Sequence, residues 1–136
     1  MFEIIEHTAD VGLRVEAETA PELFSDAGRG FASLLVENPE AVAGREAVHI
    51  DIKAEDLPTL LHDWLSELLF IYSTRGLVLV EFDIAIHETR LEAMAFGELF
   101  DPIRHMGYLD IKAVTYHQLQ LEQRPGGWHG QVIIDI

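Results

Sequence analysis

The stretch Glu6-His7-Thr8-Ala9-Asp10-Val11-Gly12 separates two apolar runs near the start of the chain, residues 1–5 and 11–15. Both runs have the composition of β-strands, and the second alternates apolar and polar residues as far as Ala17, which is typical of a half-buried strand. A simple turn between two strands would more often contain glycine, asparagine or proline. The acid, imidazole and hydroxyl groups therefore mark this stretch as a candidate functional segment between two paired strands.

The residues after this strand pair change to helical spacing. Thr19 and Glu22 have the spacing of a capping box, and apolar side chains then recur along one helical face. Gly28 and Gly30 weaken a helix but allow it to pack closely on a sheet. We therefore predict a first helix over residues 19–36.

A second helix is predicted over residues 56–75. Asp56 can cap its beginning, and Arg75 in the last turn followed by Gly76 is a common stop signal. Its apolar stripe is wide, which indicates that other elements cover this helix on more than one side.

The remaining patterned stretches have strand periodicity. We predict strands over residues 48–52, 77–86, 90–96, 111–122 and 128–136, a tight connection at 88–89, loops over 39–45 and 102–110, and a hairpin turn at 124–127. Strands that follow one another directly pair antiparallel, and helices that do not alternate regularly with strands indicate the α+β class. The sequence thus predicts one domain over residues 1–136, with a mostly antiparallel β-sheet packed with two main helices.

Composition and charge exclude several classes of function. The chain has 24 acidic and 9 basic residues and a net charge of −15, so we expect no direct binding to nucleic acid, whereas a basic protein or a cation is a plausible partner. The lack of cysteine excludes disulfides, thiol catalysis and cysteine zinc sites. No phosphate-binding glycine motif, secretory signal or long apolar run is present, so we expect a cytoplasmic protein without a membrane segment.

Two acids stand on otherwise apolar strands at opposite ends of the sequence. Asp10 precedes the second strand, and Asp135 comes one residue before the carboxylate of Ile136. Taken singly, Asp10 could cap a turn and Asp135 could be an exposed charge. Taken together, they suggest that both side chains and the terminal carboxylate meet in one acidic site. Such carboxylates repel one another unless a cation lies between them, and oxygen ligands favour calcium or magnesium over zinc.

Four other polar residues are weaker candidates. Lys112 is either a solvated strand lysine or a cation beside the acidic site. His7 stands among the acids of the opening stretch, and His117 lies on the same predicted strand as Lys112, where it could line the same region. Glu98 is either a turn acid or a further oxygen donor. The histidines form no HExxH or HxH pattern that would indicate a zinc site.

The motifs resemble those of the archease family, in the same order and over essentially the whole chain. The resemblance is carried by the opening stretch at residues 6–12, the second helix at 61–76, the Gly97-Glu98 turn with Asp101, the Lys-Ala-x-Thr-Tyr-His strand at 111–117, and the apolar ending at 132–136. One position departs from the family pattern, because Leu99 stands where proline is usual in the Gly-Glu-Pro-x-Asp turn.

This resemblance implies a function that composition and spacing do not. Archeases are protein cofactors of the GTP-dependent tRNA-splicing RNA ligase, and they promote guanylylation of the ligase's active-site histidine and its multiple turnover. The resemblance implies that Asp10, Asp135 and the Ile136 carboxylate bind a divalent metal, and that Lys112, with His7 as a second candidate, takes part in activation. The chain would then be an activator and not itself an enzyme.

Two other classes of function stay open from the sequence. A chaperone-like modulator of RNA-processing proteins would bind many clients and need neither Asp10 nor a metal. A metal-dependent phosphoester hydrolase built on the same acids would turn over substrate by itself, which activation of a separate ligase does not require.

Overall fold

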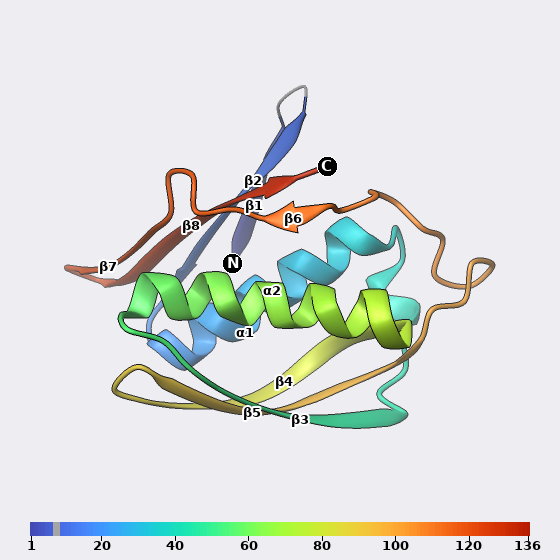
Figure 1. Ribbon diagram of the computed structural model, residues 1–136, viewed down its shortest axis with the longest axis horizontal. Helices are drawn as coiled ribbons and strands as arrows, with labels where there is room; N and C mark the ends of the chain where they lie inside the picture. The colour runs from blue at the N-terminus through green and yellow to red at the C-terminus, as the bar shows by residue number, and fades with distance from the viewer. Residues whose placement is uncertain (7–8) are drawn as a thin grey trace.

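Two helices lie between two antiparallel β-sheets, and Figure 1 shows these three layers with the helices in the middle. The computed structural model describes the chain except residues 7–8. The first sheet contains β1 (Phe2–Glu6), β2 (Asp10–Ala17), β6 (Ala113–Val114), β7 (Gln120–Arg124) and β8 (Gly127–Asp135). The second sheet contains β3 (Glu46–Lys53), β4 (Leu77–His87) and β5 (Arg90–Leu99). The helices are α1 (Ala20–Leu35) and α2 (Leu57–Arg75).

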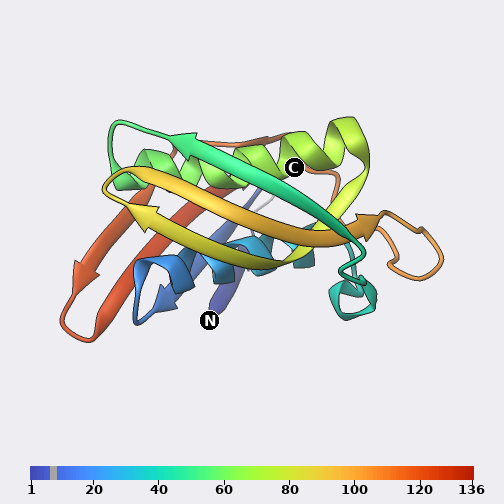
Figure 2. The same ribbon diagram turned by 90° about the horizontal axis from the view of Figure 1, so that it is seen from below.

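The order of strands places the last strand in the interior of the first sheet. This order is β1-β2-β8-β6, and β7 also pairs with β8, so β8 has neighbours on both sides. The second sheet has the order β3-β5-β4 and crosses the opposite side of the helices (Figure 2). The predicted α+β class, antiparallel pairing and two helices are confirmed. The strands form two sheets and not the one expected, because alternation shows which face of a strand is buried but not which sheet the strand joins.

Local signals set the helix ends as predicted. The Thr19 hydroxyl accepts a hydrogen bond from the Glu22 backbone N–H at 3.3 Å, and the Asp56 carboxylate accepts one from the Thr59 N–H at 2.8 Å. Gly76 ends α2 in the left-handed conformation at φ 69°, which glycine adopts at little cost. Among the described residues, no helix is both long and apolar enough to cross a bilayer.

The glycines of α1 allow it to approach both sheets. A β-carbon at Gly28 would lie 2.6 Å from the ring of Phe82 on β4. One at Gly30 would lie 2.8 Å from the side chain of Leu13 on β2. Both distances are shorter than van der Waals contact, so α1 could not sit this close to either sheet with larger residues at these positions. The buried apolar side chains of both sheets and both helices form one cluster.

The predicted strand over residues 111–122 is wrong in its middle. Only β6 and β7 are strands, and both pair with β8, at Val114 opposite Ile134 and at Gln120 opposite Gln131. The five residues 115–119 between these points therefore face only the two residues 132–133 of β8. The surplus cannot stay paired and forms a turn, in which Gln118 has a φ of 52°.

Candidate functional site

The two acids from the ends of the sequence lie directly opposite each other. Asp10 of β2 pairs with Asp135 of β8, and residues directly opposite in an antiparallel pair extend to the same face. Their neighbours Val11 and Ile134 point to the other face and are buried in the core. The two half-buried carboxylates therefore share the outer face of the first sheet. This pairing destabilises the sheet unless a positive charge neutralises the acids.

The backbone of Lys112 and the end of the chain, marked C in Figure 1, lie next to this pair. The Ile136 N–H donates to the carbonyl of Ala9 at 3.3 Å, which places the last residue beside the start of β2. On the other side of β8, the Lys112 N–H donates to the carbonyl of Asp135 at 2.9 Å. Residues from three separate parts of the sequence thus meet at one end of the first sheet.

The side chains of Asp10 and Asp135 carry oxygen donors, the kind of ligand that a hard divalent cation prefers. Neither Asp10 nor Asp135 forms an ion pair with any residue that the structure describes, so both carboxylates are available as oxygen ligands. The described part of the chain contains no group of three or more His, Asp or Glu side chains arranged to hold a metal ion. A third carboxylate or imidazole ligand here would therefore have to be the Ile136 carboxylate or a group outside the described residues. His7, the other predicted residue of this stretch, lies outside the described residues.

Sequence reasoning missed a histidine that holds β6 in place. His62 of α2 is buried, and its ring stacks on Tyr116 with centroids 3.7 Å apart and an interplanar angle of 16°. Its Nε2 lies 2.9 Å from the carbonyl of Val114, and its Nδ1 lies 2.8 Å from the carboxylate of Asp63. A carbonyl can only accept, so Nε2 carries a proton and donates. His62 thereby fixes β6, and with it the backbone next to Lys112, against α2.

His117 and Lys112 do not lie on one continuous strand as predicted, because the chain turns between β6 and β7. His117 is exposed in the turn over residues 115–119, where its N–H donates to the Thr115 hydroxyl at 3.3 Å. Its side chain is therefore not placed by strand alternation. The buried His62 had no signal of its own in the sequence, because it stands among the apolar residues of α2 with the polar neighbour Asp63.

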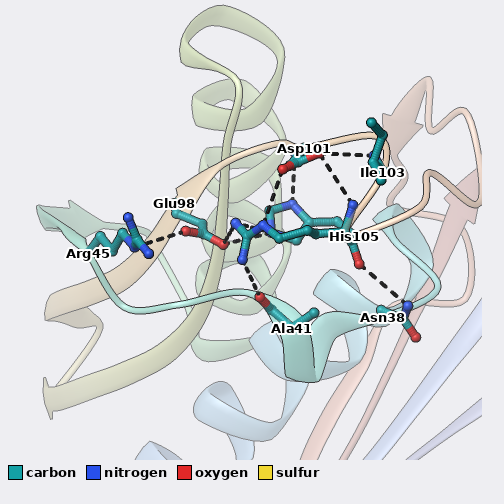
Figure 3. A network of polar contacts seen from close by, with 8 residues as sticks. Asn38, Ala41, Arg45, Glu98, Asp101, Ile103 and His105 are labelled. Carbon is teal, nitrogen blue, oxygen red and sulfur yellow. Dashed lines mark hydrogen bonds and ion pairs between the residues drawn. The ribbon is translucent and has the colours of Figure 1, made fainter.

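A second polar cluster surrounds Glu98 at the end of β5 (Figure 3). The side chain of Glu98 is only 7% exposed, and its carboxylate accepts hydrogen bonds from His105 Nε2 at 2.7 Å and from the Arg104 guanidinium. Arg45 Nε lies 3.5 Å from its second oxygen. His105 is fully buried, and its Nδ1 accepts from the Asp101 N–H at 2.9 Å, so the donating nitrogen is Nε2.

These bonds assign Glu98 to the turn and not to the acidic site. The hydrogen bond from the Ala43 backbone, together with those from His105 and Arg104, outweighs burial and lowers the pKa of Glu98 to about 2. Its two oxygens are already engaged by Arg45, Arg104 and His105. Of the two roles that the sequence left open, the structure supports the turn acid.

The lowered pKa of Glu98 makes stability depend on pH in a defined window. The ordinary pKa is 4.5 and the folded value is about 2, so ionised Glu98 stabilises the fold above pH 4.5, and this contribution is lost as the pH falls toward 2. In urea titrations, we expect Glu98→Gln to have a lower free energy of unfolding than the parent at neutral pH, with the difference shrinking across this window. Glu122→Gln is the control, since Glu122 is half exposed and its only ion pair among the described residues is with Arg124. A difference that is the same at every pH would contradict the assignment.

Comparison with known proteins matches the whole chain to one family. The model of the Archease protein family (MTH1598/TM1083) matches residues 2–136. Protein archease of Methanosarcina mazei is 37% identical over 140 residues, which covers 99% of this chain and 95% of that protein. Protein archease of Pyrococcus abyssi is 36% identical, with 99% and 98% covered.

Two solved structures have the same fold. The solution structure of Methanobacterium thermoautotrophicum protein 1598 superposes with a TM-score of 0.86 at 30% identity, covering 99% of this chain and 98% of that one. A Thermotoga maritima crystal structure, described as an archease and possible chaperone, has a TM-score of 0.68 at 20% identity, covering 100% and 98%.

Proposed function

The chain belongs to the archease family, and on that basis we propose that it activates the GTP-dependent tRNA-splicing RNA ligase by promoting guanylylation of that enzyme. One observation carries the proposal. Asp10 and Asp135 lie opposite each other on neighbouring strands, with Lys112 and the end of the chain beside them. Like charges directly opposite each other destabilise a sheet, so a protein with no use for these two acids would be more stable without them.

In this proposal, Asp10, Asp135 and the Ile136 carboxylate hold a divalent cation, calcium or magnesium. Such a cation supplies positive charge that neutralises the phosphate oxygens of a bound nucleotide. The protein residues hold the site in position: β2 and β8 present the carboxylates on one face, and the Ile136 N–H bond to Ala9 keeps the chain end next to them. Because the strands are hydrogen-bonded on both sides of Asp135, the ligands are held on a rigid element.

Lys112 is a cationic residue whose backbone lies beside this site. It is exposed and forms no ion pair with the described residues, so its ammonium group is available to a phosphate or carboxylate of the partner. Its position is fixed through its own backbone bond to Asp135 and through the His62 contact to Val114. We propose that Lys112 stabilises negative charge during guanylylation of the ligase.

The charge of the chain favours a protein as its partner. A net charge of −15 disfavours RNA but complements the basic RNA-binding face of a ligase. The chain would dock there, in the cytoplasm, and leave when the RNA substrate arrives. Chaperone-like binding is the second candidate, because the Thermotoga maritima protein of the same fold is described as a possible chaperone. That function would need neither Asp10 nor a cation.

The test is guanylylation of the ligase with GTP and a divalent cation, with and without this chain. We expect Lys112→Ala to reduce the activation by about 10-fold or more, because groups placed at developing charge have large effects on rate. Its stability should change by only about 0.5 kcal/mol, as for other surface substitutions. Lys53→Ala, which removes an exposed lysine from the other sheet, is the matched control and should activate normally. Equal activation by the Lys112 and Lys53 variants would show that Lys112 is only a solvated charge.

A further inference from the structure

An exposed apolar turn follows β5 and extends beyond the two sheets, at the edge of the molecule (Figure 2). Ile103 at this turn is 87% exposed, and two other apolar side chains near it, Leu99 and Met106, are 61% and 44% exposed. Isolated exposed apolar residues are ordinary, but these three lie within residues 99–106, and we call them the apolar patch.

The backbone of this turn is held firmly although its apolar side chains are exposed. The Asp101 carboxylate accepts hydrogen bonds from the N–H groups of Ile103 at 2.9 Å and Arg104 at 3.3 Å. The guanidinium of Arg104 also donates to the carbonyl of Ala41 at 3.3 Å, and the Asn38 N–H donates to the carbonyl of His105 at 3.0 Å. Figure 3 shows Ile103 at one end of this network.

This network reduces the entropic cost of binding through Ile103. A side chain on a loose loop loses conformational freedom when it binds, whereas one on a fixed turn has already lost it. Binding energy in protein interfaces is concentrated in a few anchors that enter pockets, with weaker contacts around them. Ile103 has the position of such an anchor, and Leu99 and Met106 have the position of the surrounding contacts.

Acids without partners border the patch. Glu37, whose N–H donates to the Met106 carbonyl at 2.7 Å, and Glu46, which lines a groove with Leu99, are both exposed and form no ion pair with the described residues. Of the cations near the patch, Arg45 and Arg104 are engaged with Glu98, which leaves only Arg75, next to Gly76 and Leu99, against these two acids. The rim of the patch is therefore negative.

We propose that this turn is a second docking element, in which Ile103 enters an apolar socket bordered by lysine or arginine on the basic face of the ligase. The inference rests on the proposed function for the identity of the partner. The charge argues against the two other occupants, because a net charge of −15 repels both a second copy of the chain and an anionic membrane. The ligase would then be held at two separate points, one by the acidic site and one by the turn.

The experiment compares Ile103→Asp with Phe70→Asp, which changes an exposed apolar residue on α2 that is 60% exposed. We expect Ile103→Asp to raise the dissociation constant for the purified ligase at least 10-fold, and to raise the half-saturating concentration in guanylylation by the same factor. The maximal activation and the affinity for calcium should be unchanged. Phe70→Asp should stay within 2-fold of the parent in every measurement.

Each outcome decides one of the two proposals. If Ile103→Asp binds the ligase as tightly as the parent does, the docking turn is wrong. If Ile103→Asp does not fold, Met106→Ala is the substitute variant, and it should weaken binding by a smaller factor. Self-association of the parent that Ile103→Asp abolishes, or binding to phosphatidylcholine vesicles, would identify another occupant and overturn the proposal. A parent that binds the ligase through Ile103 without activating it refutes the proposed function but keeps the docking turn, and a parent that does not bind the ligase refutes both.

Discussion

A chain with residues appended after Ile136 is expected to lose divalent-cation binding, and with it ligase activation, as severely as Asp135→Ala. Side chains of adjacent strand residues point to opposite faces, so Asp135 and the side chain of Ile136 cannot both reach the acidic site. The terminal carboxylate can, because it continues along the backbone that pairs with Ala9. An appended residue replaces this carboxylate with a neutral amide carbonyl and crowds the site.

The size of this effect follows from what metal sites tolerate. Loss of an outer-sphere partner alone costs about 10–100-fold in metal affinity, so we expect about 100-fold or more for a direct ligand. Calorimetric titration with calcium and with magnesium measures it, and ligase guanylylation measures the consequence. An extension before Met1 is the control, since the contacts of the terminal amine, to the Asp26 carboxylate and the Glu16 carbonyl, lie at the other end of β2 from Asp10. Parent-like affinity of the extended chain would remove Ile136 from the site and leave Asp10 and Asp135 to be completed by another group.

Replacing Gly97 with alanine is expected to destabilise the protein more than the same substitution at any other glycine of the chain. A β-carbon at Gly97 would lie 1.7 Å from the carbonyl oxygen of Val78 and 2.8 Å from the α-carbon of Leu79. These are backbone atoms of β4, at the point where its register with β5 shifts. β5 is the central strand of its sheet, so it cannot move away from β4 without losing its pairing with β3.

Overpacking in cores usually costs 1–3 kcal/mol, and a clash with fixed backbone belongs at or above the upper end, so we expect about 3 kcal/mol or more. Thermal unfolding should show a decrease in the midpoint of about 10 °C. Gly44→Ala is the control, because its β-carbon would meet only Phe96 at 3.5 Å. A Gly97→Ala variant with the same unfolding midpoint as Gly44→Ala would contradict this account. The clash also explains why glycine precedes Glu98, whose position fixes the turn.

The parts of the fold that local signals determine could be predicted from the sequence. Thr19 and Asp56 mark helix starts through bonds within a few residues, and Gly76 marks an end through its own φ angle. That Asp10 and Asp135 lie near each other could also be predicted, because both stand on otherwise apolar strands; that they are directly opposed partners could not. A resemblance to a family, and not spacing, supplied the function.

The contacts between distant residues could not be predicted in the same way. His62 meets Val114 across 52 positions of sequence, and Arg45 approaches Glu98 from a different strand connection. The break between β6 and β7 depends on a mismatch in length with β8, which no alternation pattern within residues 111–122 records. The sequence pattern does not show which distant segments contact each other. That information is needed to predict both the split into two sheets and the cluster around Glu98.

The interior position of β8 has a consequence for the synthesis of the protein. β2 is made early but receives its second neighbour only after about 110 further residues, which takes about 5–20 s at ordinary rates of translation. During this time the nascent chain exposes an open strand edge, which can pair with other chains. The charged residues Asp10, Arg14 and Glu16 alternate along this edge, and such charges discourage aggregation of unpaired strands. The same aspartate that we assign to the cation site would thus already protect the half-made molecule.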